Sequence, residues 1–449
     1  MASYRMSATE FLSSGTKVED YARALLDRIA ARDVQVQAWA YLDPEFVLSQ
    51  ARKLDAIPQE QRGPLHGVPI GVKDIFYTKD MPTQHNSPIY ANDAPVVDAA
   101  LIMMLRTAGA LIFGPPSHRV YVHVFQPFSG KTTTTQFASI TVGTKTMNPH
   151  NPARTPGGSS SGSGAAVADF QVPVALGTQT IGSIIRPASF CGIYSFKPTW
   201  GALPREGVKV CSLNFDTMGF FARSIADIEL LADAARLEDD EKPIAPFKIE
   251  GAKFAACKTH VWPEVGPGTI NAMQLAVKLL RDQGASVEEL DLPGEFASVT
   301  RSHLQAFQQD AATTFKSEYI RSKDQLDPAL VAFVENPEKT SHRDHLAALD
   351  NLAQLRPKID IIASRYDAII TPSVVDEAPE GLTSTGNPAL CGMWTALHVP
   401  VVNVPGFAGD HGMPVGLSLV APRYHDRRLL SVAAAVAPVF EGGGWKSSL

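Results

Sequence analysis

The amino-acid sequence predicts an α/β fold, and three observations support this prediction. Apolar segments at 65–73 and 172–176 have the length and character of buried strands. An amphipathic helical pattern at 96–108 leads into a short strand at 111–113, which is the alternation typical of α/β proteins. Apolar residues make up 45% and charged residues 19% of the 449 residues, as in ordinary globular proteins. A chain of this length can bury a large core in one to three domains.

Local patterns predict further elements along the chain. The tetrapeptides 7–10 and 16–19 both have the Ser/Thr-x-x-Glu form of a capping box, so each predicts the start of a helix. The same kind of analysis predicts a strand at 38–42, a helix beginning at Pro44, a helix capped by Ser224, a strand at 366–371, and a strand followed by a helix within 412–436.

Charge and cysteine content exclude several classes of function. The net charge is −6, which gives no electrostatic basis for binding nucleic acid or an anionic membrane. No apolar run reaches the roughly 18 residues of a membrane span, and residues 1–15 lack a secretion-signal pattern. The four cysteines have no Cys-x-x-Cys spacing, so neither a zinc site nor a disulfide framework is predicted. We therefore expect a cytoplasmic protein without a metal.

The chemically informative residues concentrate at 155–199. This stretch opens with Gly157-Gly158 and a run of three serines, whose hydroxyls can act as nucleophiles or carry protons. After the strand at 172–176 the chain turns through the mostly small residues 177–182 and reaches Ser183. Backbone N–H groups in such a turn can converge on an anion.

Four motifs in and before this stretch resemble those of the amidase signature family of serine hydrolases. The Gly-Gly-Ser-Ser run is matched at 157–160, and the Gly-Ser that precedes an Ile/Val-Arg-Pro region is matched at 182–187. The Phe-Cys-Gly and Lys-Pro-Thr elements are matched within 190–199. Upstream, Gly-Val-Pro-x-x-x-Lys-Asp is matched at 67–74. The resemblance extends over nearly the whole chain.

The resemblance implies a domain organisation. One amidase signature domain would cover 1–449, with a central mixed β-sheet flanked by helices. Its signature core would lie at about 60–235, and a variable, mostly helical region at about 238–365 would shape the substrate pocket.

The resemblance also implies a Ser–Ser–Lys mechanism. Ser183 would attack the substrate carbonyl, Ser159 would relay the proton, and a neutral Lys73 would accept it. Burial would have to lower the pKa of Lys73 for this role. The family holds the serine matching Ser159 through a cis peptide bond, here Gly158–Ser159.

The turn before Ser183 would provide the oxyanion hole and part of the substrate site. Backbone N–H groups of Thr180, Ile181 and Gly182 would stabilise the oxyanion. We expect Gln179 and Trp394 to contact the substrate. Water would release the acyl group, and neither a metal nor an organic cofactor would be required.

The chain departs from the family pattern at four places. Gln179 replaces an aspartate found in many members, Ile181 replaces a glycine, and Arg186 comes one position late. We expect Ile181 either to narrow the acyl side of the pocket or to tighten the turn. Residues 115–129 resemble an insertion of about a dozen residues in which alternating valines predict a hairpin strand.

The predicted activity is hydrolysis of linear amides of small molecules. Esters and carbamates are alternative substrates. A second alternative is that the chain is the amidotransferase subunit of a tRNA-dependent amidation complex. The sequence also allows a homodimer. A competing interpretation places the nucleophile at Ser160, within a Gly-x-Ser-x-Gly elbow at 158–162. That elbow needs an apolar strand before it, and the proline-rich segment 148–156 cannot form one.

Overall fold

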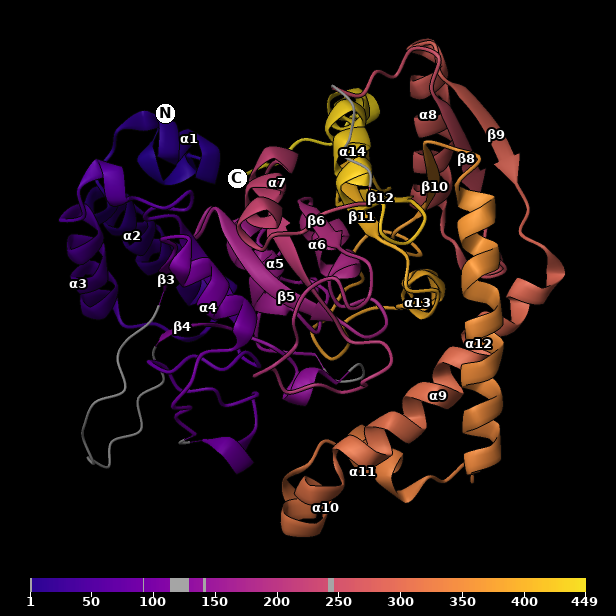
Figure 1. Ribbon diagram of the computed structural model, residues 1–449, viewed down its shortest axis with the longest axis horizontal. Helices are drawn as coiled ribbons and strands as arrows, with labels where there is room; N and C mark the ends of the chain where they lie inside the picture. Colours follow the sequence, from indigo (N-terminus) through magenta and orange to yellow (C-terminus); the bar gives the residue numbers. More distant parts are fainter. Residues whose placement is uncertain (1, 92, 114–128, 140–142, 241–245) are drawn as a thin grey trace.

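One mixed β-sheet runs through the middle of the molecule, and helices cover its faces (Figure 1). The computed structural model describes residues 2–91, 93–113, 129–139, 143–240 and 246–449. Within these ranges, twelve strands form the sheet: β1 (Trp39–Tyr41), β2 (Pro69–Lys73), β3 (Leu111–Ile112), β4 (Ser129–Thr132), β5 (Val174–Gln179), β6 (Tyr194–Lys197), β7 (Thr217–Ala222), β8 (Lys253–Cys257), β9 (Ser286–Leu290), β10 (Ala368–Pro372), β11 (Val401–Ala408) and β12 (Pro414–Val420).

The strand order is β1-β4-β2-β5-β7-β6-β11-β12-β10-β8-β9, and β3 pairs with β2 beside this path. The pairs that β2 makes with β3, β4 and β5 are parallel, as are those of β8 with β9 and β10. The remaining pairs are antiparallel. The prediction of an α/β fold with a central mixed sheet is therefore confirmed.

Most helices lie between strands along the chain, whereas α9 to α12 follow one another, and the helices bury their apolar faces against the sheet or against one another. They are α1 (Ala8–Ser14), α2 (Val18–Val36), α3 (Pro44–Asp55), α4 (Ala100–Thr107), α5 (Ser161–Ala168), α6 (Ile185–Cys191), α7 (Ile225–Ala234), α8 (Pro267–Asp282), α9 (Val299–Thr314), α10 (Lys316–Ser322), α11 (Pro328–Glu335), α12 (His342–Ala363), α13 (Ala389–Ala396) and α14 (Asp426–Phe440). Helices α9 to α12 form an arm beside the sheet, drawn in orange in Figure 1.

Some local predictions hold and others need correction. Ser7 forms a complete capping box at α1, and Ser224 caps α7. The second capping box is wrong: α2 begins at Val18, and its first N–H groups are accepted by the carboxylate of Asp55 from α3 instead. The predicted insertion at 115–129 lies outside the described residues, except that Ser129 opens β4.

The segment 238–365 is mostly helical, and it also holds two strands. It contributes β8 and β9, which extend the central sheet at one edge, before the chain leaves into α9–α12 and returns as β10. The apolar runs in these two strands are short and are surrounded by charged residues, so the local pattern does not distinguish them from the helices around them.

Helix α5 packs unusually close to the sheet because its residues are small. A Cβ atom added at Gly162 would lie 2.2 Å from the Ala38 carbonyl oxygen and 2.4 Å from the Thr133 nitrogen. Only glycine fits between these backbone atoms. The serines that precede this helix are thereby held against the strand that ends in Lys73.

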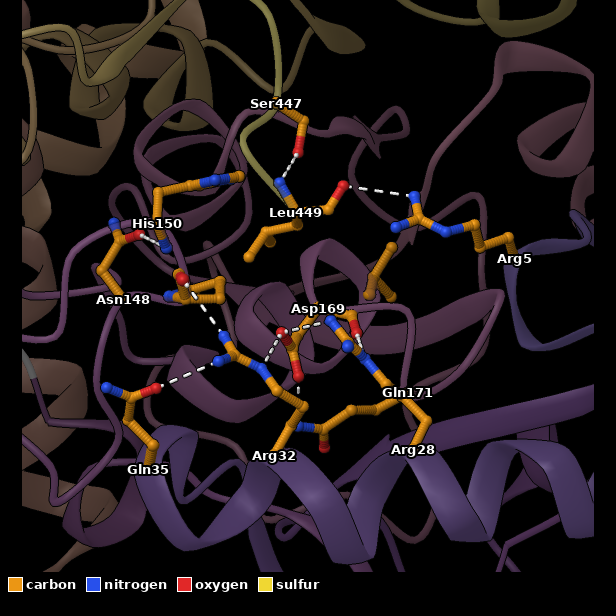
Figure 2. A network of polar contacts seen from close by, with 12 residues as sticks. Arg5, Arg28, Arg32, Gln35, Asn148, His150, Asp169, Gln171, Ser447 and Leu449 are labelled. Carbon is orange, nitrogen blue, oxygen red and sulfur yellow. Dashed lines mark hydrogen bonds and ion pairs between the residues drawn. The ribbon is translucent and has the colours of Figure 1, made fainter. Parts of the chain in front are cut away.

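The C-terminal end of α5 is held by the Asp169 cluster, which we define as Asp169, Arg28, Arg32 and Gln171 (Figure 2). The buried Asp169 carboxylate lies 3.0 Å from the guanidinium groups of both Arg28 and Arg32, which come from α2. Gln171 Nε2 donates to the other carboxylate oxygen at 2.9 Å. Every charge in this cluster therefore has an opposite charge beside it.

All four cysteines are buried and free: Cys191, Cys211, Cys257 and Cys391. None of the helices in the described ranges combines the length and apolar character needed to cross a lipid bilayer.

Candidate active site

The end of β2 places Lys73 in the protein interior. Its side chain is fully buried, and Nζ is hydrogen-bonded to Ser159 Oγ at 2.8 Å and to Thr178 Oγ1 at 2.9 Å. In the described part of the chain, no carboxylate forms an ion pair with this nitrogen. Burial lowers the pKa of Lys73 to about 7, and the more distant Asp216 offsets this only in part. Lys73 can therefore exchange a proton near neutral pH.

Ser159 is buried and follows a cis peptide bond, Gly158–Ser159, as the resemblance implied. The carbonyl oxygen of Gly158 accepts a hydrogen bond of 2.6 Å from the fully buried guanidinium of Arg186. Arg186 also donates to the Gly386 carbonyl at 2.7 Å and so ties the serine segment to the chain before α13. The arginine that comes one position late in the sequence thus still reaches the serine segment.

The turn after β5 is fixed through its carbonyl groups. The Thr180 carbonyl accepts from His303 Nε2 at 3.1 Å, the Ile181 carbonyl from Thr395 Oγ1 at 2.8 Å, and the Gly182 carbonyl from the Arg186 nitrogen at 2.9 Å. In a trans peptide unit the N–H points opposite to the C=O. The N–H groups of the residues at 181–183 are therefore directed away from these three partners.

Those N–H groups make no hydrogen bond to the described residues. Among the described residues, no group accepts a hydrogen bond from the backbone N–H of Thr180, Ile181, Gly182 or Ser183. Buried N–H groups are rarely left unpaired without a ligand or water to accept them. The turn therefore presents a set of donors suited to an oxyanion.

The side chain of Gln179 links this turn to the start of α6 and to α13. Its side-chain oxygen accepts from the N–H groups of Ile184 and Ile185 at 2.8 and 3.0 Å, and Nε2 donates to Thr395 Oγ1 at 2.9 Å. The amide also lies beneath the first turn of α6. Contact of Gln179 with substrate stays a prediction.

Trp394 lies on α13 and is almost completely buried, with no hydrogen-bond partner for Nε1 among the described residues. Its predicted contact with substrate is likewise untested.

Ile181 packs toward α13. A Cβ atom added at Gly392 would lie 3.2 Å from Ile181 Cγ2 and 3.4 Å from His303 Nδ1. The side chain of Ile181 is buried in this contact, which favours the tightening of the turn over the narrowing of the acyl pocket.

The competing nucleophile Ser160 is engaged by the backbone. Ser160 Oγ lies 3.3 Å from both the nitrogen and the carbonyl oxygen of Thr178, and the residue is fully buried. No strand precedes it in the described chain between β4 and α5. Ser183 lies at the end of the turn, and in the described chain its hydroxyl makes no hydrogen bond.

Three residues near the site were not predicted from the sequence. Thr178 Oγ1 accepts a hydrogen bond from Lys73 Nζ. Asp216 accepts a hydrogen bond from the hydroxyl of Thr180 at 2.5 Å. Gln179 pairs with Thr217 where β5 and β7 meet, so the adjoining residues, Thr180 and Asp216, face each other. Burial raises the pKa of Asp216 to about 6. His303 comes from α9, far along the chain, and no local pattern marks it. In the residues that the structure describes, no group of three or more His, Cys, Asp or Glu side chains could hold a metal ion.

The fold and the lysine–serine contact define the class of the molecule, an α/β protein with a site suited to acyl transfer. The model of the Amidase family matches residues 20–430. The chain therefore belongs to this family, the amidase signature family.

Known relatives agree with this assignment. A glutamyl-tRNA(Gln) amidotransferase subunit from Acidothermus cellulolyticus is 30% identical over 470 residues, which cover 94% of this chain and 91% of that protein. The corresponding protein from Lysinibacillus sphaericus is 28% identical over 469 residues, or 95% and 94% of the two chains. A crystal structure of an amidase superposes with a TM-score of 0.83 at 25% identity, covering 96% of this chain and 99% of that one.

Proposed function

We propose that this protein hydrolyses the carbon–nitrogen bond of a linear amide through an acyl-enzyme on Ser183. The observation that supports this most directly is the contact between the buried Lys73 Nζ and Ser159 Oγ at 2.8 Å. Burial lowers the pKa of Lys73 to about 7, so that a base is available near neutral pH.

In the proposed reaction the Ser183 oxygen bonds to the substrate carbonyl carbon. Its proton passes to Ser159, which transfers its own proton to Lys73. When the carbon–nitrogen bond breaks, the proton returns through Ser159 to the leaving amine. A water molecule then attacks the acyl group, and its proton travels by the same route until Ser183 leaves as a hydroxyl. This route requires Ser183 to hydrogen-bond to Ser159 in the substrate complex.

The free N–H groups at 180–182 support the assignment of an oxyanion hole there. They lie in a buried turn, where hydrogen bonds to a developing negative charge are stronger than in water. Esters and carbamates can be cleaved by the same acyl-enzyme steps, and the leaving-group pocket decides among them.

The experiment that tests the proposal is covalent labelling with a fluorophosphonate, followed by mass spectrometry. We expect a single adduct on Ser183 and none in Ser183→Ala. An adduct on Ser160 would contradict the assignment. A parallel screen of anilides, primary amides, esters and carbamates then identifies the preferred leaving group.

The pH dependence of kcat/KM provides a second test of the base. Because the protonated form of Lys73 is inactive and its pKa is about 7, activity should rise as pH increases through about 7 and level off above it. An activity that falls between pH 7 and pH 8 would contradict the assignment of Lys73.

A second candidate function is supported by the relatives named as glutamyl-tRNA(Gln) amidotransferase subunits, whose length this chain matches almost completely. In that case the chain would act as one component of a larger complex. Turnover of simple amides by the isolated chain favours the hydrolase. Activity only after the addition of partner proteins favours the amidotransferase.

We further propose that the substrate is a small molecule and that the protein is cytoplasmic. The four free, buried cysteines suit a reducing compartment. A homodimer stays a prediction, which light scattering of the purified chain would test.

A further inference from the structure

His303 connects the arm of helices α9–α12 to the turn that carries the candidate oxyanion donors. The residue lies on α9, is almost completely buried, and approaches the Thr180 carbonyl oxygen to 3.1 Å through Nε2. A carbonyl oxygen only accepts hydrogen bonds, so Nε2 must carry the hydrogen. Burial lowers the pKa of His303 to about 4, and the ring is therefore neutral at physiological pH.

We propose that His303 is a positioning residue for the oxyanion turn: its Nε2–H holds the Thr180 carbonyl and thereby aims the N–H of Ile181 at the reacting carbonyl of the substrate. This inference rests on the proposed function. The C=O of Thr180 and the N–H of Ile181 belong to the same planar peptide unit and point in opposite directions. A constraint on one therefore orients the other.

The hydrogen bond from His303 to the Thr180 carbonyl also makes the N–H of Ile181 a stronger donor. An amide whose carbonyl accepts a hydrogen bond is polarised, so its N–H becomes a better donor to a second acceptor. His303 thus contributes to the stabilisation of an oxyanion that it never touches.

The imidazole ring itself is held in place by its neighbours. Phe215 meets it edge-on with ring centroids 4.4 Å apart. The missing side chain of Gly392 leaves room for both His303 Nδ1 and Ile181 Cγ2, which would lie 3.4 and 3.2 Å from a Cβ atom there. The ring therefore has little freedom to leave the carbonyl.

Thr180 has a second attachment, which separates positioning from folding. Its hydroxyl donates to the buried Asp216 at 2.5 Å, on the side of β7. Loss of the His303 hydrogen bond leaves this attachment intact, so the turn should stay folded while the peptide unit of Thr180 and Ile181 gains freedom to rotate. A catalytic defect without unfolding is the result expected of a positioning residue.

The test compares three variants of the full chain: His303→Leu, His303→Gln and Ser302→Ala. Leucine fills the space but donates no hydrogen bond, whereas the amide of glutamine can replace the Nε2–H donor. Ser302 is a matched control, since it is buried on the same helix but bonds to Asn351 of α12. Rates are expressed per active site titrated with a fluorophosphonate, so that partly folded preparations remain comparable.

For His303→Leu we expect kcat on an anilide to fall by about 10- to 100-fold with KM changed less than about twofold, because the lost orientation acts only in the transition state. A trifluoromethyl ketone, which forms a tetrahedral adduct, should lose affinity by a similar factor. His303→Gln should recover most of kcat, and Ser302→Ala should match the wild type.

A wild-type kcat in His303→Leu, or equal losses in the leucine, glutamine and Ser302→Ala variants, would overturn the inference. If the wild type itself shows no labelling and no turnover, it is the proposed function that fails.

Discussion

The candidate active site around Lys73 and the Asp169 cluster both contain buried charged side chains, but only in the cluster is the charge paired with an opposite one. Asp169 lies 3.0 Å from each of two guanidinium groups, so its charge is compensated (Figure 2). Lys73 is buried as deeply, yet its direct partners are the hydroxyls of Ser159 and Thr178. A buried charge with an opposite charge beside it stabilises the structure. A buried lysine without such a partner has a lowered pKa, so it can exchange a proton near neutral pH. The difference fits the structural role of the Asp169 cluster and the base that we propose for Lys73.

The largest expected effect comes from removing the uncompensated group. Lys73→Ala should lower kcat by about 10³-fold or more, in the range for loss of a catalytic-triad member, while the chain stays folded. The measurement is turnover of an anilide per titrated active site, together with circular dichroism.

Lys197→Met is the matched control for this change. Burial also lowers the pKa of Lys197 to about 7, but its Nζ bonds to the carbonyl oxygens of Pro198 and Val399, which cannot be activated as nucleophiles. Its turnover per active site should stay within about threefold of the wild type. Equal losses in both variants would refute the distinction between the two lysines.

Removing the compensated charge should affect stability instead of catalysis. Asp169→Ala leaves two arginines beside an empty acceptor site, and we expect a loss of about 3 kcal/mol in the free energy of unfolding. Urea denaturation measures this loss. The exposed Asp27 lies on α2, as the two arginines do, and provides a control. Its replacement by alanine should change the free energy of unfolding by less than about 0.5 kcal/mol. A stable Asp169→Ala with low kcat per active site would reverse the assigned roles.

Because the charge of Lys73 is buried without an opposite charge beside it among the described residues, its removal should stabilise the protein. The pKa of Lys73 is about 7 in the folded chain and 10.5 ordinarily, so between these values the unfolded chain binds more protons and wild-type stability rises with pH. Below pH 7 Lys73 is charged in both the folded and the unfolded chain, so the folded chain bears the full free-energy cost of burying that charge. Lys73→Met should therefore be more stable than the wild type by about 1–3 kcal/mol at pH 6.5, with the difference shrinking toward pH 10.

Denaturation of both proteins at pH 6.5, 8 and 9.5 checks this prediction. The other buried lysines occur in both proteins, so their effects cancel in the difference. A difference that does not change with pH would show that Lys73 has an ordinary pKa in the folded chain.

The smallest effect concerns packing within the candidate active site. Ile181→Val keeps the Cγ2 methyl that contacts α13 but removes the Cδ1 methyl of a buried side chain, and this should cost about 0.5–1.5 kcal/mol in the free energy of unfolding. Because the side chain faces Gly392, the ratio of kcat/KM for a bulky-acyl anilide to that for acetanilide should stay within about twofold. A clear rise in that ratio would mean that Ile181 lines the acyl pocket after all.

Local sequence patterns predicted the parts of the molecule that depend on neighbours in the chain. Glycine and serine spacing located the turn that ends at Ser183, and the apolar run before Lys73 located β2. The capping box at Ser7 could be predicted, because its two partners lie three residues apart. The start of α2 could not, because its N–H groups are accepted by Asp55 from another helix.

The residues that complete the site come from distant segments. Thr178 lies in the turn 177–182 that the sequence marks, whereas Asp216 lies in no motif described above, and their bonds to Lys73 and Thr180 depend on strand pairing. His303 lies in the arm, and only the packing of α9 against α13 brings it to the turn. A sequence pattern does not encode such contacts, so the turn could be predicted while the roles of Thr178, Asp216 and His303 beside it could not.

The burial of all four thiols has a practical consequence. Burial raises the pKa of the Cys257 and Cys391 thiols to about 12, and it raises those of Cys191 and Cys211 as well. Thiols of this kind react with iodoacetamide only when the chain around them opens. Cys211 lies beside Asp216 at the candidate active site, and Cys257 lies in β8 toward the opposite edge of the sheet. Their alkylation rates therefore report, from natural residues alone, which half of the molecule opens first under mild denaturant.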